Sequence, residues 1–453
     1  MQEPVQSTPD FSFDNKALRK MLVPLFLEQL LLLLVGIADT LVISYAGESA
    51  VSGVSLVNQF NTVFILLFTA LASGGAVVVS QYIGRQDTEK AGEAASQLLL
   101  FSGLFSVLLA AGVLLGGRAL LRLLFGRVEE EVMAACVTYQ RVSAYSYPAL
   151  AVYNAGAALC RSMGKTKVTM NISILANIVN VAGNLTGVFV LHAGVAGVAY
   201  PSLLVRIFSA AAITCYCFRG KSRVAYRAVW LARWNGPLLK GILHIAVPNG
   251  IESGIFQLVK VALSSMVALF GTCQIAANGI AQSIWSLAAM CGTVMGTVFI
   301  TVIGQCMGAG DIPAAEGWFR KLLKLTVLLS GGWNGVILLL TPLLLRLYAV
   351  EPETARLVFW LVALHNLFNS VAFPFSGALG NGLRAAGDVT FTMVVAIAST
   401  VGGRFLLSWL LGVVFQMGVM GIAAAMCFDW VVRGLLYFWR VRSGRWKAFR
   451  VIE

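Results

Sequence analysis

Four polar residues lie within apolar stretches of the chain, and their spacing could form a cation site. Asn177, Asn180 and Asn184 are spaced at i, i+3 and i+7, so on a helix their amides share one face. Asp39 lies 19 residues beyond Lys20, about 28 Å along a helix, and a charge inside an apolar span indicates a function. One carboxylate with several amide oxygens suits a hard cation or a proton. The alternative is that these side chains only join helices through hydrogen bonds.

The composition places the elements that carry these residues in a bilayer. Hydrophobic residues make up 58% of the 453 residues, charged residues make up 12%, and the mean hydropathy is +0.82, which is too apolar for an ordinary soluble protein. A membrane-spanning helix needs about 20 apolar residues. Candidate spans are 20–46, 52–83, 95–117, 133–160, 168–191, 194–217, 241–270, 275–307, 321–346, 356–383, 389–415 and 418–440. The sequence therefore predicts an all-α integral membrane protein with twelve transmembrane helices.

An internal repeat divides these helices into two halves. Pro24 matches Pro248 and Glu28 matches Glu252 when the chain is shifted by 224 positions. The same shift pairs Gly47 with Gly271, Gln81 with Gln305, Gly84 with Gly308 and Asp87 with Asp311. A single shift that holds over this many pairs indicates a duplicated unit. Because each half has an even number of helices, both halves enter the membrane from the same side and the repeats are parallel. Transporters that work by alternating access have such repeats. The expected domains are an amino-terminal six-helix bundle (1–218), a cytoplasmic linker (219–240) and a carboxy-terminal six-helix bundle (241–453).

The distribution of basic residues predicts how the chain is oriented in the membrane. Lys and Arg concentrate in the loops and terminal segments on one side of the bundle, and four of the six loops on the other side have neither. Because short cytoplasmic loops are enriched in Lys and Arg, we expect a plasma (inner) membrane protein with both termini in the cytoplasm and no cleaved signal peptide. The net charge of +13 then reflects this bias and contact with anionic lipid. We expect a monomer without a nucleic-acid partner.

Catalytic and metal chemistry are not indicated. The eight cysteines lie mostly singly in apolar segments without paired CxxC spacing, and the chain has three histidines, so no metal or redox centre is predicted. No P-loop, nucleophile elbow or HExxH motif occurs in the sequence. The sequence predicts neither an enzyme nor a resident cofactor, apart from Na⁺ or H⁺ as a coupling ion.

The second half has charged residues of its own within predicted helices. Glu252 and Lys260 are two turns and a little apart, which leaves both near one face. Both residues could have either a functional or a structural role. Asp429 and Arg433 are spaced i,i+4, and a structural ion pair is the expected use of that spacing.

Further polar residues could face a cleft between the halves. Glu28 lies two turns beyond Lys20 and could be an interfacial anchor. Its register with Glu252 favours instead a symmetric pair of carboxylates at the inner mouth, where cationic substrates would meet them. Other candidates for the cavity lining, with packing as the alternative, are Tyr145, Tyr153, Asn154, His365, Asn366 and Asn369.

A series of short motifs runs in order over essentially the whole chain. The motifs are Asp39-Thr40, Gln81-Tyr-Ile-Gly84, Arg161-Ser-Met-Gly164-Lys165, Asn177-Ile-Val-Asn180, Gly194-Val-Ala-Gly197, Ala276-Ala-Asn278, Gly304-Gln-Cys-Met-Gly308 and Leu383-Arg384-Ala-Ala-Gly387-Asp388. Each motif is weak alone, but all of them in order are specific, and together they resemble the multidrug and toxic compound extrusion (MATE) family. The resemblance implies a secondary transporter that exports organic, often cationic, compounds against an inward flow of Na⁺ or H⁺.

The resemblance also implies a cation site in the first half. In the family an Asp of the first helix, an Asn and an Asp of the fifth and a Thr of the sixth line this site. The matching positions here are Asp39, Asn180, Asn184 and Ser202. Asn184 thus replaces the second Asp, and Ser202 follows Pro201, which could bend that helix. A site with one carboxylate can be neutralised by Na⁺ or by a proton, so the ion stays open.

The second half departs further from the family pattern. Leu263 stands at the position that matches Asp39, and Phe256 stands where other members have an acidic residue. We expect a cation-coupled exporter of small organic compounds. A flippase for a lipid-linked sugar is the alternative on the same broad fold, and it should favour a larger basic cavity than the few intramembrane cations provide: Arg141, Lys260, Arg404 and Arg433. A receptor or scaffold is disfavoured by the duplication.

Overall fold

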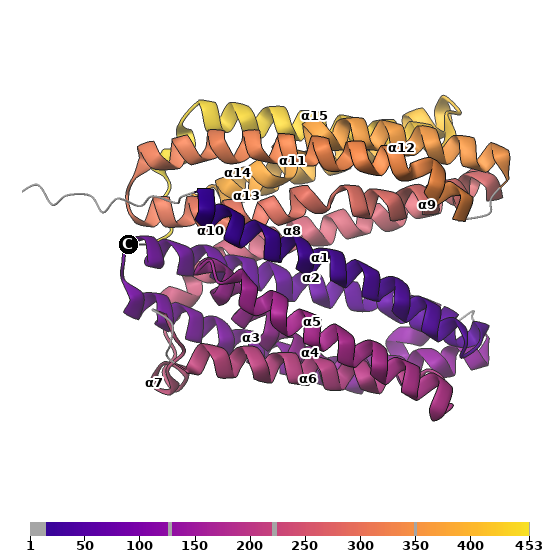
Figure 1. Ribbon diagram of the computed structural model, residues 1–453, viewed down its shortest axis with the longest axis horizontal. Coiled ribbons are helices and arrows are strands. Elements are labelled where there is room, and N and C mark those ends of the chain that lie inside the picture. The colour runs from indigo at the N-terminus through magenta and orange to yellow at the C-terminus, as the bar shows by residue number, and fades with distance from the viewer. Residues whose placement is uncertain (1–14, 126–128, 220–223, 348–350, 453) are drawn as a thin grey trace, which may run out of the picture.

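Two bundles of long helices lie side by side in the protein (Figure 1). The computed structural model describes residues 15–125, 129–219, 224–347 and 351–452, and over these ranges the chain is helical without strands. The bundles meet most closely at the end where the first helix begins and the last long helix ends, called here the terminal end. They diverge toward the opposite, far end (Figure 1).

The helices follow the order expected from the repeat. The first bundle contains α1 (Asn15–Ser44), α2 (Glu48–Gly84), α3 (Thr88–Phe125), α4 (Glu130–Ser162), α5 (Thr166–Leu185) with its π-helical extension η1 (Thr186–Val190), and α6 (Ala196–Phe218). A short helix, α7 (Ala228–Leu231), follows the first bundle in the sequence and packs against α3 at the outer edge of that bundle (Figure 1). The second bundle contains α8 (Gly236–Val267), η2 (Ala268–Phe270), α9 (Thr272–Ala288), α10 (Met290–Gly308), α11 (Ile312–Leu347), α12 (Pro352–Phe373), η3 (Pro374–Ala378), α13 (Leu379–Ala385), α14 (Val389–Ala398), η4 (Ser399–Leu406), η5 (Trp409–Val414) and α15 (Gly418–Arg442), followed by η6 (Arg445–Ala448).

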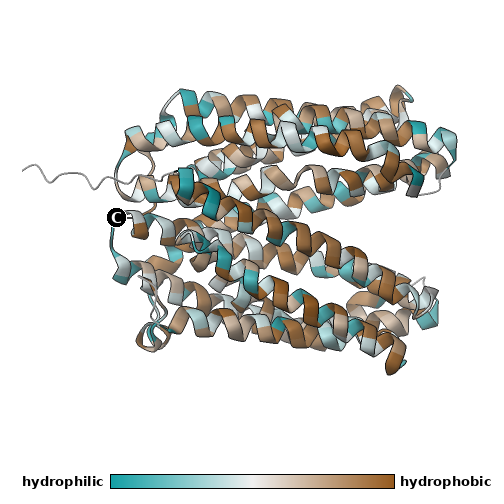
Figure 2. Ribbon diagram, in the orientation of Figure 1, coloured by the Kyte–Doolittle hydropathy of each residue, from teal (hydrophilic) through white to brown (hydrophobic). Residues whose placement is uncertain are grey.

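The apolar composition is distributed along these helices as a membrane protein requires. Eleven helical stretches of the described residues are long and apolar enough to cross a bilayer, and hydrophobic residues cover most of their length (Figure 2). Of the twelve predicted spans, the one that does not reach this level is α4, which has 33 residues. At 1.5 Å per residue this helix is still about 50 Å long, enough to span. The predicted all-α membrane fold is confirmed.

The predicted span 275–307 is interrupted at Ala289, between α9 and α10. Two side chains of α11 approach the carbonyl groups just before the break. Trp333 Nε1 donates to the Leu287 carbonyl at 2.8 Å and Asn334 Nδ2 to the Ala288 carbonyl at 3.4 Å. Side chains that take up such carbonyl groups interrupt the helical ladder. The break therefore depends on a neighbouring helix, and the apolar pattern could not predict it.

The predicted span 389–415 also departs from a regular α-helix. Beyond α14 it continues as the π-helical segments η4 and η5. Such segments are rare and occur often at functional sites, because the extra residue per turn re-aims the side chains.

Reciprocal hydrogen bonds join the two halves at the terminal end. Gln81 Nε2 of α2 donates to the Ala385 carbonyl at 2.8 Å, and Gln305 Nε2 of α10 donates to the Ser162 carbonyl at 2.7 Å. The two donors differ by 224 positions and the two acceptors by 223. These bonds are therefore symmetry mates under the repeat.

Two glycines allow this close approach. A Cβ atom at Gly84 would overlap the Gln305 carbonyl, and one at Gly308 would overlap the Gln81 carbonyl. Any larger residue would push α2 and α10 apart. The bonds of Gln81 and Gln305 and these two glycine contacts are called here the terminal seal.

Candidate functional site

A carboxylate and two amides meet within the first bundle. Asn180 Nδ2 on α5 donates to both carboxylate oxygens of Asp39 on α1 at 3.1 Å, and Asn184 Nδ2 donates to Asp39 Oδ1 at 2.7 Å. Ser202 Oγ on α6 donates to Asn180 Oδ1 at 3.3 Å. Asn180 and Asn184 are buried and Asp39 is half-buried. These four residues are called here the Asp39 cluster.

Close packing of α5 on α6 makes the cluster possible. Gly187 and Gly197 face each other so closely that a Cβ atom on either would overlap the backbone of the other. A Cβ atom at Gly183 would lie 2.7 Å from the Pro201 ring. Pro201 itself lies within α6 and does not end the helix. The small residues bring Ser202 within reach of the α5 amides.

The Asp39 cluster has the atoms to hold one monovalent cation or one proton. Asn184 Oδ1 is buried and has no hydrogen-bond partner among the described residues, so an unused acceptor stands beside Asp39. A protonated carboxyl group needs an acceptor, and Na⁺ is a hard cation that needs oxygen ligands. The third predicted amide, Asn177, lies outside the hydrogen-bonded cluster, because its buried Nδ2 has no partner in the described part of the chain.

The two symmetry-related glutamates are each paired with an arginine. Glu28 is 2% exposed, and its Oε1 lies 3.0 Å from Arg161 Nη2. Thr169 Oγ1 donates to Glu28 Oε2 at 2.9 Å. Glu252 lies 2.6 Å from Arg384 Nη2, so both halves repeat one ion pair. The sequence expectation of a symmetric pair that meets cationic substrates did not include these arginines, and each carboxylate charge is already neutralised within its own half.

A third ion cluster lies in the second bundle. Asp429 on α15 is fully buried, and its Oδ1 lies 2.8 Å from Arg433 Nη2. The expected i,i+4 ion pair is therefore present. Arg404 of η4 is a second partner, with its Nε 3.2 Å from Asp429 Oδ2. Sequence reasoning missed this contact because η4 and α15 meet only in the folded bundle.

A polar cavity of about 260 Å³ lies between the halves, next to the terminal seal. Thr69 and Ser73 of α2 line it together with Thr293 and Thr297 of α10, and each pair differs by 224 positions. Of the predicted cavity residues, Asn154 is in this lining. Sequence reasoning missed the four hydroxyl groups, although the repeat register relates them. Other polar lining residues are Arg161, Asn249, Ser253, Thr301 and Asn381.

A larger polar cleft of about 770 Å³ lies between α2 and α8, toward the far end. Its lining is Ser55, Asn58, Gln59, Thr62, Gln257, Lys260, Val261, Ser264 and Ser265. Lys260 is exposed there and has no ion-pair partner among the described residues. It does not pair with Glu252, which is bound to Arg384.

Five predicted cavity residues lie outside this cleft and the 260 Å³ cavity: Tyr145, Tyr153, His365, Asn366 and Asn369. Tyr145 is 57% exposed, and Tyr153 packs against the main hydrophobic core. The three residues of α12 are buried in the second bundle. Both of its asparagines donate to Asn334 of α11, at 3.2 and 2.9 Å, so that face of α12 is turned toward α11 and not toward the cleft.

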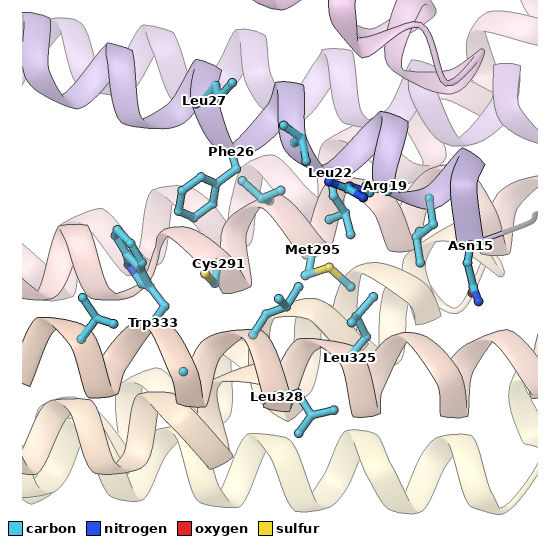
Figure 3. Close-up of a pocket in the computed structure, with 16 residues that line it drawn as sticks. Asn15, Arg19, Leu22, Phe26, Leu27, Cys291, Met295, Leu325, Leu328 and Trp333 are labelled. Atoms are coloured by element: carbon cyan, nitrogen blue, oxygen red, sulfur yellow. The ribbon is translucent and has the colours of Figure 1, made fainter.

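An apolar crevice of about 960 Å³ runs between α1 and the helices α10 and α11 (Figure 3). Phe26 and Trp333 meet across it edge to face, with ring centroids 5.1 Å apart. Its polar side chains are Asn15 and Arg19, near the start of α1, and Trp333. An ion would find no ligands over most of this crevice, so it does not compete with the Asp39 cluster as a coupling site.

Comparison with known proteins identifies the family. The MatE family profile matches residues 24–186 and 248–410. Both bounds differ by 224 positions, the same shift that relates Glu28 to Glu252 and Gln81 to Gln305. The chain belongs to the MatE family. The duplication expected from the sequence is thereby confirmed.

Similar proteins cover the MatE chain almost from end to end. The uncharacterized transporter YisQ of Bacillus subtilis is 27% identical over 93% of both chains. The probable multidrug resistance protein NorM of Thermotoga maritima is 23% identical over 99% of this chain and 96% of its own. The fold also matches an outward-facing multidrug resistance MATE family transporter with a TM-score of 0.88, 19% identity and coverage of 94% and 95%.

Another solved structure with this fold is a MOP superfamily transporter from Pyrococcus furiosus, described as having a reverse polarity of the binding pocket that suggests a different function. It has a TM-score of 0.87 and 20% identity, over 94% of this chain and 95% of its own. At 20% sequence identity, the similarity to this structure establishes only the fold. The compounds that the pockets can bind have to be inferred from the residues of this chain.

Proposed function

We propose that this protein is a secondary antiporter that exports small organic compounds in exchange for Na⁺ or H⁺. The Asp39 cluster carries the proposal. It holds a carboxylate within a membrane-spanning helix, where an ionised group is costly, and one bound cation or proton would neutralise it. The other described carboxylates deep within the spans, Glu28, Glu252 and Asp429, are each bound to an arginine, whereas Asp39 is bound to amides.

The arrangement of the halves supports alternating access. The terminal seal closes one end of the interface, and the 770 Å³ cleft lies toward the other end. With the terminal end in the cytoplasm, as the basic loops predict, the cleft faces outward. Breaking the reciprocal bonds of the terminal seal and closing the far end would produce the inward-facing state.

Helix α1 connects the coupling site to the second bundle. Asp39 binds the amides of α5 near one end of this helix, and Phe26 contacts Trp333 of α11 nearer its other end. Neutralising Asp39 weakens its charge-assisted bonds to Asn180 and Asn184. The position of α1 between the bundles would then change with the bound ion.

Proteoliposomes test the proposal. Purified protein is reconstituted into vesicles containing ethidium, dansylcadaverine or dansylglycine, and a Na⁺ gradient or a pH gradient is imposed, one at a time. Movement of any dye driven by one gradient, and abolished by an ionophore that dissipates it, is the expected result and identifies the ion. Dye movement that neither gradient changes would contradict antiport.

A further inference from the structure

The second bundle contains a pocket that corresponds to the Asp39 cluster through the repeat. The shift of 224 positions places Asp39 on Leu263, Asn180 on Arg404 and Ser202 on Met426. Leu263, Arg404 and Met426 all line one pocket of about 90 Å³. Its polar lining residues are Lys260, Ser264, Asn278, Gln282, Trp285 and Arg404, and it is called here the basic pocket.

The charge of this pocket is opposite to that of its counterpart. The carboxylate position holds Leu263 and one amide position holds Arg404. Arg404 and Arg433 share the single carboxylate of Asp429, so this cluster keeps one net positive charge. Lys260 adds a second, because it has no ion-pair partner in the described ranges. Among the described residues, no carboxylate lines the basic pocket or the adjoining cleft.

A donor group in the basic pocket lacks an acceptor. Trp285 Nε1 is buried and, within the described part of the chain, has no hydrogen-bond partner. Arg404 also lines the pocket and is 6% exposed, with its Nε 3.2 Å from Asp429 Oδ2. Lysine, arginine and tryptophan side chains donate but do not accept. Buried donors are almost always satisfied in proteins, and a ligand that brings acceptor oxygens would satisfy the Trp285 donor.

Neighbouring groups hold Arg404 at the pocket wall. Its guanidinium lies 4.8 Å from the Phe256 ring centroid, a distance at which a cation is attracted to the ring face. Phe256 lies on α8, four residues before Lys260. An aromatic ring therefore helps to position a guanidinium at this wall of the pocket.

The basic pocket and the adjoining cleft differ in size, so each can hold a different part of a ligand. A volume of about 90 Å³ is far below the roughly 300–1,000 Å³ of a site for a drug-sized ligand, so the basic pocket can hold one small group. The cleft of about 770 Å³ falls within that range and shares Lys260 and Ser264 with the pocket. A ligand can thus lie in the cleft with one group in the basic pocket.

We propose that the basic pocket binds a carboxylate or similar anionic group of the exported compound, so that the transporter prefers organic anions and zwitterions to simple cations. This proposal rests on the exporter function proposed above and specifies its substrate class. Planar anions suit a guanidinium, because its donors are arranged in a fork that matches a carboxylate.

A matched pair of dyes tests the preference. Dansylglycine carries a carboxylate and dansylcadaverine a primary amine on the same fluorophore. Binding to the purified protein in detergent is measured by fluorescence anisotropy, with protein-free micelles as the blank. We expect dansylglycine to bind at least about tenfold more tightly, which corresponds to about 1.4 kcal/mol. Equal binding, or tighter binding of dansylcadaverine, would overturn the proposal.

Substitutions at Lys260 locate the site. Lys260 is exposed, so Lys260→Gln should fold and bind dansylglycine about tenfold more weakly, while Lys260→Arg should restore most of the affinity. Lys240→Gln is the matched control, since Lys240 is an exposed lysine of the same helix, about 30 Å away along its axis. Equal losses for the two glutamine variants would show a general charge effect and reject the pocket.

Transport separates this proposal from the exporter function. If the wild-type vesicles move dansylcadaverine under a gradient and dansylglycine neither binds nor moves, the exporter function stands and the anion preference fails. If dansylglycine binds through Lys260 but no dye moves under either gradient, the pocket is established and the antiport function fails.

Discussion

Replacing Asp39 with asparagine separates the charge of the Asp39 cluster from its shape. Two amides, those of Asn180 and Asn184, donate to the Asp39 carboxylate. A hydrogen bond to a charged group contributes about 1.5–3 kcal/mol and one to a neutral group about 0.5–1.5 kcal/mol, so the loss for the two amides is about 2–3 kcal/mol in total. Removing the charge from a membrane-spanning helix recovers about 2.5–3.5 kcal/mol. The two terms nearly cancel, and Asp39→Asn should fold.

Transport should nevertheless be lost in this variant. Without a carboxylate, the site has no charge for Na⁺ or a proton to neutralise. Gradient-driven dye accumulation in proteoliposomes should therefore fall at least about tenfold, which corresponds to about 1.4 kcal/mol. Dye binding in detergent and the unfolding temperature should stay close to those of the wild type. Asp39→Glu, which restores the charge, should recover part of the transport.

Glu316→Gln is the matched control. Glu316 lies 2.6 Å from Lys447, and both side chains are partly exposed at 36% and 37%, so this pair contributes at most about 1 kcal/mol and lies away from the Asp39 cluster. Its variant should transport normally. Wild-type accumulation by Asp39→Asn would refute the coupling role, and loss of folding by Asp39→Asn would show that the charge is structural.

Three further predictions concern the ion pair, the terminal seal and the missing carboxylate. Arg161→Gln should destabilise the protein by about 3–5 kcal/mol, because it leaves a buried charge on Glu28 unpaired; adding Glu28→Gln should restore stability in thermal unfolding, and an equally unstable double variant would contradict the pairing. Gly84→Ala should cost about 1–3 kcal/mol by overpacking and speed hydrogen exchange at the ends of α2 and α10, whereas Gly103→Ala, which enters open space, should do neither. Asn184→Asp adds a carboxylate beside Asp39, so half-maximal transport should need a several-fold lower concentration of the coupling cation, and an unchanged requirement would place residue 184 outside the ion site.

The sequence alone determined the fold class and the duplication. A chain of this apolarity must satisfy its backbone hydrogen bonds within each span, and helices do so locally, so length and composition were sufficient. The register of 224 positions also related Glu28 to Glu252 before any contact was known. Helical periodicity placed Asn180 and Asn184 on one face, where the structure shows both amides bound to Asp39.

Partners across the bundle could be decided only by the tertiary structure. Glu28 and Arg161 are 133 positions apart, and local patterns do not state which helices will be neighbours or how they are rotated. For that reason the arginine partners of the two glutamates were not foreseen, and the sequence left open whether the polar residues of α12 line the cleft or pack inside the bundle.

The sign of the charge in the second bundle was the hardest feature to foresee. Arg404 is one of several intramembrane cations in the sequence, and its place in the basic pocket depends on the π-helical geometry of η4, on Phe256 and on its distance from Asp429. A helix pattern fixes which residues share a face, but the extra residue in each π-turn changes that face. The packing of η4 against α8 and α15 therefore determines what the pocket can bind.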